Sequence, residues 1–318
     1  MKGKGVKSKK LIDPDLLALS SAFPSMTFSQ EVLPIIREKV LELAVQSNPE
    51  ASGVEKKEIL VPSRSNDPDV RCLLYQPKNR PVSAAYLQIH GGGFMIDRAE
   101  AGEVRNIELA STLGVTVLAV DYRLAPENPY PAALNDCYSA LLWLGENADE
   151  LNISTNRIAV GGDSAGGGLA AGLCLHARDG EGPEIAFQSL IYPMLDDRTS
   201  APGATPNPWA GEIVWTPENN RFAWSSYIGE ADPNECVPAR ATTLAGLPPT
   251  WIATGALDLF AEENLEYARR LLRGGVATEL HVYPGVFHGF DLAAEAAVVK
   301  RFKNDHAMAL ARGLGITL

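Results

Sequence analysis

The sequence predicts an α/β protein in which a mostly parallel central sheet is flanked by helices on both faces. Two observations carry this prediction. From residue 54 onward, short apolar runs alternate with stretches of helical periodicity, which is the order of elements in βαβ units. The chain also has 318 residues, 46% of them hydrophobic, which is enough for one large domain with or without a small accessory piece.

Each predicted element has its own local signal. Apolar runs bounded by proline, glycine or polar residues predict strands at 54–62, 69–77, 84–90, 115–123, 157–162, 185–193, 250–255 and 278–284. Apolar residues at helical spacing predict helices at 27–47, 101–114, 131–151, 165–180, 261–275 and from about residue 291 onward.

The starts of two helices carry specific signals. In the first helix, Thr27 and Gln30 fit a capping box, whereas Pro34 favours a later start because proline is tolerated only in the first turn. Glu262 and Glu263 fit the acidic first turn of the helix predicted at 261–275, where negative charge stabilises the helix dipole.

Two stretches interrupt the alternation and predict a helical cap. Residues 1–53 precede the first strand and contain the amphipathic helix, and residues 195–248 are rich in proline, with Trp209, Trp215 and Trp224 among polar residues. We therefore expect residues 54–194 and 249–318 to form the two parts of the α/β core. Residues 1–53 and the insertion at 195–248 are expected to pack together over it.

A serine surrounded by glycines lies between a predicted strand and a predicted helix. Ser164 belongs to "VGGDSAGGGLA", residues 160–170, and matches G-x-S-x-G. In that motif the serine takes strained backbone angles that project its hydroxyl, and the glycines allow backbone segments to approach closely. On the motif alone, a serine N-cap and a phosphate-binding loop stay open, although no G-K-[ST] follows. The strand before it and the helix after it favour a nucleophile.

A second glycine cluster follows the strand predicted at 84–90. It reads His-Gly-Gly-Gly-Phe and begins at His90. A glycine run can turn backbone N–H groups toward a substrate oxygen, where each donor contributes about 3–4 kcal/mol in acyl transfer. We expect the N–H groups of Gly92, Gly93 and Ala165 to form an oxyanion hole. His90 is expected to hold the loop through its ring nitrogens.

A general base and its carboxylate partner are predicted near the C-terminus. His288 lies in "PGVFHGF", between the last strand and the last helix, and Asp258 follows the penultimate strand in "GALDLFAEEN". The chain order Ser164, Asp258, His288 is that of a serine hydrolase triad whose acid fixes the imidazole tautomer. Asp196 and Asp197 remain rivals for the acid, because some hydrolases supply it from an earlier strand.

Composition argues against several kinds of partner. The net charge of −11 disfavours nucleic acid and anionic membrane surfaces. The sequence has no apolar stretch of about 18 residues, so no transmembrane helix is expected.

The cysteines form no C-x-x-C or C-x-x-H pair, so neither a zinc site nor a disulfide framework is expected, and the cytoplasm is the expected compartment. The basic N-terminus is followed by two aspartates and a proline, which does not fit a signal peptide.

Five motifs, taken in order, resemble the hormone-sensitive-lipase-like esterases, a carboxylesterase family of the α/β-hydrolase fold. They are "HGGGF", "DYRLAPENPYPAAL", "GGDSAGGGLA", "GALDL" and "FHGF". The resemblance implies a catalytic triad and an oxyanion hole, made of Ser164, Asp258 and His288 and of Gly92, Gly93 and Ala165 respectively. It also implies that residues 122–127 brace the H-G-G-G loop. Many members have Asp-Pro where Leu259 follows Asp258 here, so the turn at that point differs.

The resulting functional prediction is a serine carboxylesterase that hydrolyses small-molecule esters through an acyl-enzyme without a metal or organic cofactor. Tryptophans in the predicted cap, with Phe94, Phe287 and Phe290 near the site, favour short- to medium-chain acyl groups. An amidase, deacetylase or lactonase would use the same triad and stays open. A non-catalytic receptor is disfavoured because "FHGF" keeps its histidine. The resemblance also permits a homodimer through the sheet edge at 278–284.

Overall fold

The computed structural model describes residues 6–22, 27–43, 49–64, 66–79, 82–180 and 182–317. Within them lies one sheet built from β1 (Val54–Val61), β2 (Val70–Pro77), β3 (Ala85–Ile89), β4 (Thr116–Val120), β5 (Ile158–Asp163), β6 (Phe187–Ile191), β7 (Thr250–Gly255) and β8 (Thr278–Tyr283). The strand order is β1-β2-β4-β3-β5-β6-β7-β8. β2 is antiparallel to its neighbours β1 and β4, and every other neighbouring pair is parallel. The predicted α/β class with a mostly parallel sheet is confirmed.

The helices of the described residues occupy the segments between the strands and the two predicted cap stretches. The α-helices are α1 (Leu17–Ala22), α2 (Leu33–Leu43), α3 (Glu103–Leu113), α4 (Ala132–Glu146), α5 (Ala148–Leu151), α6 (Ala165–Asp179), α7 (Pro217–Ile228), α8 (Pro233–Cys236), α9 (Ala261–Arg273) and α10 (Ala297–Gly313). Short 3₁₀ turns are η1 (Lys7–Leu11), η2 (Pro14–Leu16), η3 (Pro49–Ser52), η4 (Ala99–Gly102), η5 (Asp197–Ser200), η6 (Pro238–Arg240) and η7 (Phe290–Leu292).

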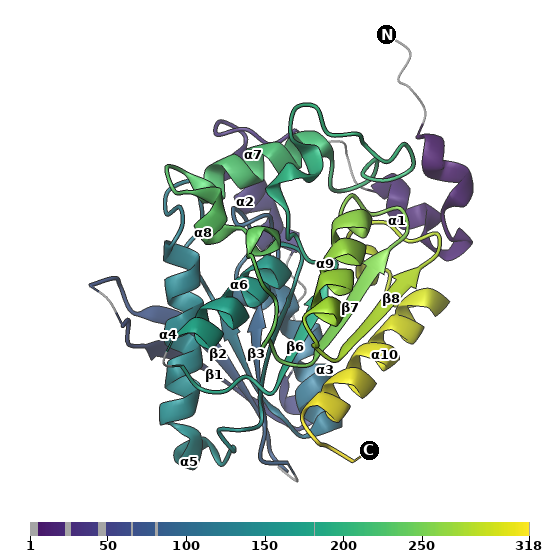
Figure 1. Cartoon of the computed structure of the whole chain (residues 1–318). Coiled ribbons are helices and arrows are strands. Elements are labelled where there is room, and N and C mark those ends of the chain that lie inside the picture. The colour runs from purple at the N-terminus through teal and green to yellow at the C-terminus, as the bar shows by residue number, and fades with distance from the viewer. Residues whose placement is uncertain are drawn as a thin grey trace.

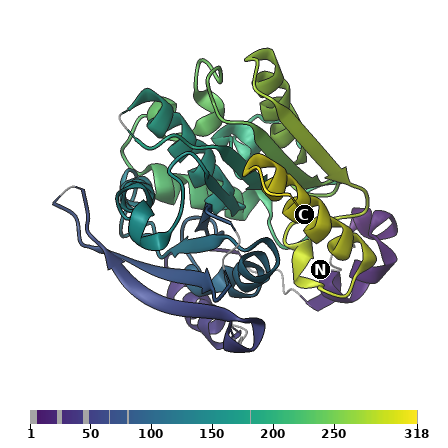
Figure 2. The same cartoon turned by 90° about the horizontal axis from the view of Figure 1, so that it is seen from below.

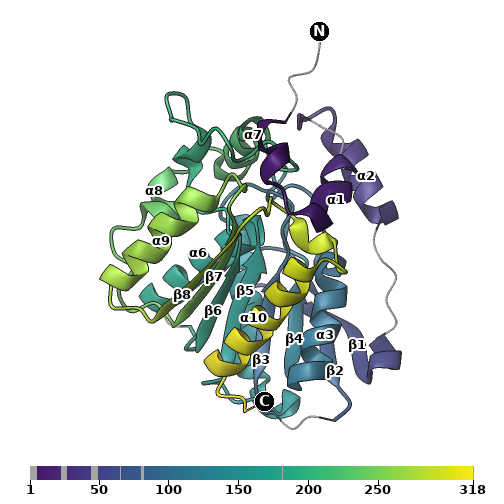
Figure 3. The same cartoon turned by 90° about the vertical axis from the view of Figure 1, so that its right-hand side faces the viewer.

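The helices form a layer on each face of the sheet. α3 and α10 cover one face, and α6 and α9 cover the other, as the side view in Figure 3 shows. α4 packs beside α6 on that second face. Seen from below, the sheet twists from the β1–β2 edge to β8 between these layers (Figure 2). The helices α1, α2 and α7 lie together at the upper end of the sheet in Figure 1.

Two hydrophobic cores result from the alternation of side chains along the strands. In β4, Leu118 and Val120 belong to the core that includes α4 and α6, whereas Val117 and Ala119 belong to the core that includes α3 and α10. Successive strand side chains point to opposite faces, so a strand covered on both sides reads as a continuous apolar run. This is why the central strands β3, β4, β6 and β7 are largely apolar runs in the sequence.

The first and last helices begin later than residues 27 and 291, and the later start that Pro34 favours for the first helix is confirmed. α2 begins at Leu33 rather than near Thr27, with Pro34 in its first turn, because proline has no N–H to donate farther along a helix. The capping box at Thr27 and Gln30 is therefore wrong, and residues 44–48 of that predicted helix lie outside the described part of the chain. The last helix begins at Ala297, and the chain near residue 291 forms η7 instead.

No helix within the described ranges is both long and apolar enough to cross a lipid bilayer.

A buried histidine in α10 predicts a dependence of stability on pH. His306 stacks on Trp251 at 5.2 Å between ring centroids, and its Nε2 has no hydrogen-bond partner among the described residues. Burial, together with a smaller effect of the nearby positive charge of Arg105, lowers the pKa of His306 to about 3. Below the unfolded-state pKa of about 6.5, the unfolded chain binds a proton that the folded chain does not, so stability falls as pH falls.

We expect His306→Phe to weaken this dependence, because phenylalanine keeps the ring stacking and cannot be protonated. The loss of unfolding free energy between pH 7.5 and pH 5 should be smaller by about 2 kcal/mol in the variant. Urea denaturation of both proteins at the two pH values measures it. Equal losses in the two proteins would show that His306 is not the group responsible.

Candidate active site

Ser164 forms the turn between β5 and α6. Its backbone angles are φ 56° and ψ −121°, a conformation that side-chain-bearing residues rarely adopt. Hydrogen bonds hold it there: its N–H donates to the Ile191 carbonyl over 2.9 Å, and its carbonyl accepts from Met194 N–H over 2.9 Å and from Gly168 N–H over 3.0 Å. The strand before the serine and the helix after it provide the context that G-x-S-x-G requires.

Two glycines of the motif allow the neighbouring backbones to meet at this turn. A Cβ on Gly162 or on Gly166 would collide with the backbone carbonyl of Ile89 at the end of β3. A Cβ on Gly166 would also collide with the carbonyl of His90. Glycine at both positions therefore brings the start of α6 directly against the loop that follows β3.

Two loops bring a histidine and a carboxylate to the serine. Asp258 follows β7, and His288 lies between β8 and α10. His288 Nε2 lies 2.9 Å from Ser164 Oγ, and His288 Nδ1 lies 2.8 Å from Asp258 Oδ2. The other oxygen of Asp258 accepts a hydrogen bond from Phe260 N–H over 3.0 Å. The three predicted side chains thus form one hydrogen-bonded chain.

The buried carboxylate determines which ring nitrogen carries the proton. Asp258 is fully buried, and Ser164 and His288 expose only 5% and 6% of their surface. An ionised carboxylate can only accept, so His288 Nδ1 donates to Asp258. Nε2 then presents its lone pair to the Ser164 hydroxyl. This arrangement can accept a proton from the serine and return it to a leaving group.

The rival carboxylates point to other partners. Asp196 forms an ion pair with Arg198 at 2.8 Å, and Asp197 forms one with Arg240 at 2.7 Å. Each of these contacts is bidentate, so both oxygens of each carboxylate are occupied by a guanidinium. Of the three aspartates considered in the sequence, Asp258 is the one that the structure places on His288.

The H-G-G-G loop lies next to the serine with free backbone donors. Gly92 and Gly93 have φ values of 90° and 60°, which favour glycine. No acceptor among the described residues takes a hydrogen bond from the N–H of Gly92, Gly93 or Ala165. Ala165 is the first residue of α6, where a helix leaves its N–H groups unpaired.

The side chains of His90 and Tyr122 support this loop through contacts with its carbonyl groups. The two rings stack at 4.1 Å, and the Tyr122 hydroxyl lies 3.0 Å from the carbonyl oxygens of both His90 and Gly91. His90 Nδ1 contacts the Gly91 carbonyl at 3.0 Å, but Nε2 has no partner among the described residues, so only one ring nitrogen holds the loop. Burial lowers the pKa of His90 to about 4, which keeps it neutral near pH 7.

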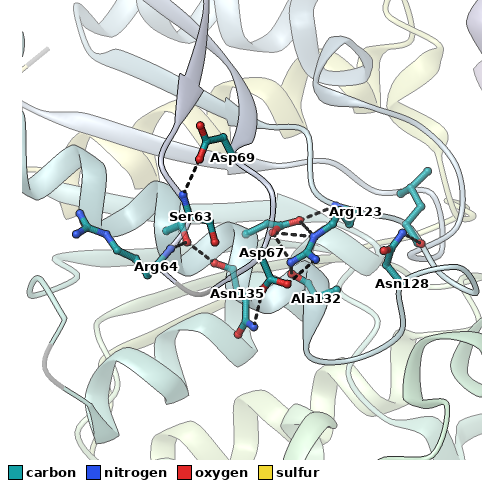
Figure 4. A network of polar contacts seen from close by, with 11 residues as sticks. Ser63, Arg64, Asp67, Asp69, Arg123, Asn128, Ala132 and Asn135 are labelled. Carbon is teal, nitrogen blue, oxygen red and sulfur yellow. Dashed lines mark hydrogen bonds and ion pairs between the residues drawn. The ribbon is translucent and has the colours of Figure 1, made fainter.

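Arg123 fixes the 122–127 segment to the core. Its guanidinium binds Asp136 in α4 at 2.8 Å and Asp67 in the β1–β2 connection at 2.9 Å, and Asp136 also accepts from the Arg123 N–H. Figure 4 shows this network, with the Ala132 carbonyl beside Arg123 and Asn135 beside Asp67. The segment that holds Tyr122 under the glycine loop is thereby anchored on two sides.

Residues from both predicted cap stretches contact the same loop. Arg37 in α2 donates to the carbonyls of Met95 and Ala125 and forms a bidentate ion pair with Glu127. Trp215 lies so close to Gly93 that a Cβ there would enter the indole ring, and its ring centroid is 6.2 Å from that of His288. Distant parts of the sequence therefore converge over the site.

Glu263 occupies its predicted place and also makes buried contacts. It lies in the first turn of α9, as expected, and its side chain is buried. It accepts hydrogen bonds from Leu195 N–H over 2.6 Å and from the Thr199 hydroxyl. Burial raises the pKa of Glu263 well above its usual value. This carboxyl anchors the start of the 195–248 stretch to the core.

Comparisons with known proteins agree with this geometry. A profile of the α/β-hydrolase fold family matches residues 86–292. Esterase LipI of Mycobacterium tuberculosis is 33% identical over 290 residues, covering 89% of this chain and 88% of its own, and carboxylesterase NlhH of the same organism is 34% identical, covering 88% of each. A bacterial heroin esterase superposes with a TM-score of 0.89 at 40% identity over 96% of this chain and 99% of its own. Esterase LipW of Mycobacterium marinum gives 0.86 at 35% identity over 96% and 97%.

The chain belongs to the hormone-sensitive-lipase-like carboxylesterase family of the α/β-hydrolase fold. The predicted family, fold and enzyme class, a carboxylic ester hydrolase, are thereby confirmed. Within the described residues of this esterase, no group of three or more His, Cys, Asp or Glu side chains could hold a metal ion.

A charged cluster that the sequence did not reveal connects the serine turn to the histidine loop. Arg105 in α3 forms ion pairs with Asp163, next to Ser164, and with Asp291, three residues after His288. Asp291 also accepts from the Tyr192 hydroxyl over 2.7 Å, and the Tyr192 ring lies 4.6 Å from the His288 ring. Burial raises the pKa of Asp163 above its usual value, although Arg105 opposes this.

We expect Arg105→Met to lower the free energy of unfolding by about 3 kcal/mol, because it leaves two poorly solvated carboxylates without their cation. Turnover should fall as well, since both loops of the site lose a shared anchor. Urea denaturation and steady-state ester hydrolysis measure the two effects. The matched control is Arg269→Met, whose exposed pair with Glu266 on α9 should matter little. Equal stability losses in the two variants would rule out a special role for Arg105.

Proposed function

We propose that this esterase hydrolyses short- to medium-chain acyl esters of small molecules through an acyl-enzyme formed on Ser164. The observation that carries the proposal is the unbroken hydrogen-bonded chain from Ser164 Oγ through His288 to Asp258. A nucleophile, a base within 2.9 Å and a buried carboxylate that orients the base are what acyl transfer to serine needs.

In the first half of the proposed reaction, His288 Nε2 takes the Ser164 proton as Oγ attacks the ester carbonyl. Asp258 holds Nδ1–H and stabilises the imidazolium that forms. His288 then gives its proton to the departing alcohol oxygen. In the second half, water loses a proton to His288 and attacks the acyl-enzyme, which releases the carboxylic acid and restores the Ser164 hydroxyl.

The proposed oxyanion hole consists of the N–H groups of Gly92, Gly93 and Ala165. These donors lack acceptors within the described part of the chain, and they belong to the loop and helix start that flank Ser164. The N-terminus of α6 adds the favourable end of a helix dipole. Preorganised donors of this kind stabilise the charge that develops on the carbonyl oxygen, by about 3–4 kcal/mol each.

Residues 1–53 and 195–248 are proposed to form the cap over this site. Support comes from the contacts that members of both stretches make with each other and with the glycine loop. Phe28 N–H donates to Asn219 in α7, and the Phe28 ring packs edge-on against Trp215 at 5.6 Å. Trp215 therefore lies beside Gly93 and His288, the neighbours of the serine, which supports a compact apolar site for short acyl groups.

The compartment and the assembly state are further parts of the proposal. The described residues include four free thiols, which suits a reducing cytoplasm; they are Cys72, Cys137, Cys174 and Cys236.

β8 is an edge strand with half-exposed side chains, and Val282 exposes 41% of its surface, which suits a homodimer through this edge. Size-exclusion chromatography with light scattering should give twice the 34.1 kDa chain mass. A purely monomeric profile at micromolar concentration would contradict the dimer.

The central experiment is Ser164→Ala assayed on p-nitrophenyl esters of increasing acyl length. The wild type should prefer acetate and butyrate over palmitate, and the variant should lose about 10⁶-fold in kcat because the nucleophile is absent. Ser225→Ala is the matched control, because its hydroxyl, on the exposed side of α7, bonds to nothing but the Phe222 carbonyl within the described residues. Undiminished turnover in Ser164→Ala would refute the nucleophile, and a preference for palmitate would refute the substrate class.

A further inference from the structure

A cavity of about 400 Å³ runs along one face of α6, away from the hydrogen-bonded chain of the active site. Ser164, Asp258 and His288 do not line it. On α6 its lining extends from Gly168 to Asp179, and the opposite wall includes α8 and the chain that follows it. The eleven steps of helix from Gly168 to Asp179 rise by roughly 16 Å, so the cavity is elongated along the helix axis.

The two ends of the cavity differ in chemistry. Near Gly168 it is closed by the rings of Phe94, Trp224 and Tyr227, which are all buried. Phe94 stacks on Tyr227 at 4.1 Å between centroids and lies 5.3 Å from Trp224. At the other end the lining residues include Asp179, which is exposed to solvent. The cavity is thus a channel with an aromatic inner end and a polar mouth.

The aromatic end lies directly behind the proposed nucleophile. Phe94 follows Gly93 of the glycine loop, and Gly168 N–H donates to the Ser164 carbonyl one turn into α6. A Cβ on Gly168 would lie 3.8 Å from Cζ of Phe94, so the ring stands against the first turn of α6. The Phe94 ring therefore occupies the space between the oxyanion loop and the inner end of the channel.

We propose that Phe94 sets the acyl-length limit of this esterase by closing its acyl pocket, and that the channel behind the ring can accept a longer acyl chain once the ring is reduced. The proposal rests on the proposed function, because it takes Ser164 as the point where the acyl group is attached. In the wild type, the chain of a bound acyl group would end at the Phe94 ring.

The channel is suited to a polymethylene chain. Leu134, Leu175, Val237 and Pro238 form apolar walls between its two ends. Its volume falls within the range of small-molecule pockets, about 300–1,000 Å³. The charged residues of the lining are Arg178, Asp179, Glu235 and Arg240, and Asp179 is exposed to solvent.

The test compares acyl-length profiles of wild type, Phe94→Leu and Phe94→Ala on p-nitrophenyl esters from acetate to laurate. Each methylene that gains an apolar pocket is worth roughly tenfold or more in kcat/KM. We therefore expect the laurate-to-acetate ratio of kcat/KM to rise by at least about tenfold in Phe94→Ala and by less in Phe94→Leu. The leucine variant keeps most of the buried volume and so guards against a variant that fails to fold.

A second substitution tests whether the gain comes from this channel. Gly172 lines it one turn beyond Gly168, and a Cβ there would have ordinary contacts at 3.9 Å from Pro238 and 4.0 Å from Leu134. Gly172→Leu fits a helix interior and should fill the channel. Combined with either Phe94 variant, it should remove the gain on laurate while acetate turnover stays. In the wild-type background it should leave the acyl-length profile unchanged, because Phe94 already closes the channel.

Three results would overturn the proposal. One is an unchanged laurate-to-acetate ratio in Phe94→Leu and Phe94→Ala while both hydrolyse acetate. Another is a gain on laurate that survives Gly172→Leu, which would place the longer chain elsewhere. The third is a loss of laurate turnover by Gly172→Leu alone, which would mean that the wild type already uses the channel. Failure of the proposed function would be distinct, since Ser164→Ala would then keep its acetate turnover.

Discussion

The backbone conformation of Ser164 is the constraint on which the site depends. A residue with φ 56° and ψ −121° is strained by an amount of order 1–3 kcal/mol, and it persists only where its surroundings fix it. Here the surroundings are hydrogen bonds to Ile191, Met194 and Gly168, together with the close approach of Ile89 that the glycines permit. Because the backbone is held in this conformation, the Ser164 hydroxyl lies 2.9 Å from His288 Nε2 and does not cap its own helix.

The remaining parts of the site are held to that turn by contacts between distant segments. Arg105 connects Asp163 with Asp291, and Tyr122 supports the glycine loop while Arg123 anchors Tyr122 to α4. Arg37 reaches the same loop from the N-terminal stretch. These contacts fix the proposed cap to the glycine loop.

The sequence was informative wherever the signal is local. Apolar runs marked the strands because the parallel sheet is covered on both faces, and glycine clusters marked Ser164 and the loop after β3 because those backbones approach too closely for a Cβ. The order of Ser164, Asp258 and His288 along the chain predicted which histidine and which carboxylate would meet the serine. The Arg105 cluster had no such signal: its partners lie 58 and 186 residues away, and an arginine in a helix looks the same whether it faces solvent or a carboxylate. The buried contacts of Glu263 had no such signal either, although its place in the first turn of α9 did, and the channel along α6 depends on packing alone.

The tie between Phe28 and α7 has a consequence for how the chain matures on the ribosome. Phe28 emerges early, but the side chain that accepts its N–H bond, Asn219, follows 191 residues later. At translation rates of about 5–20 residues per second, this interval lasts roughly 10 to 40 s. During that time Phe28 lacks its partner in α7, although Arg37 can already reach the glycine loop. Until then the Phe28 ring also lacks Trp215, against which it packs, so this contact between the two proposed cap stretches forms only when most of the polypeptide has been made.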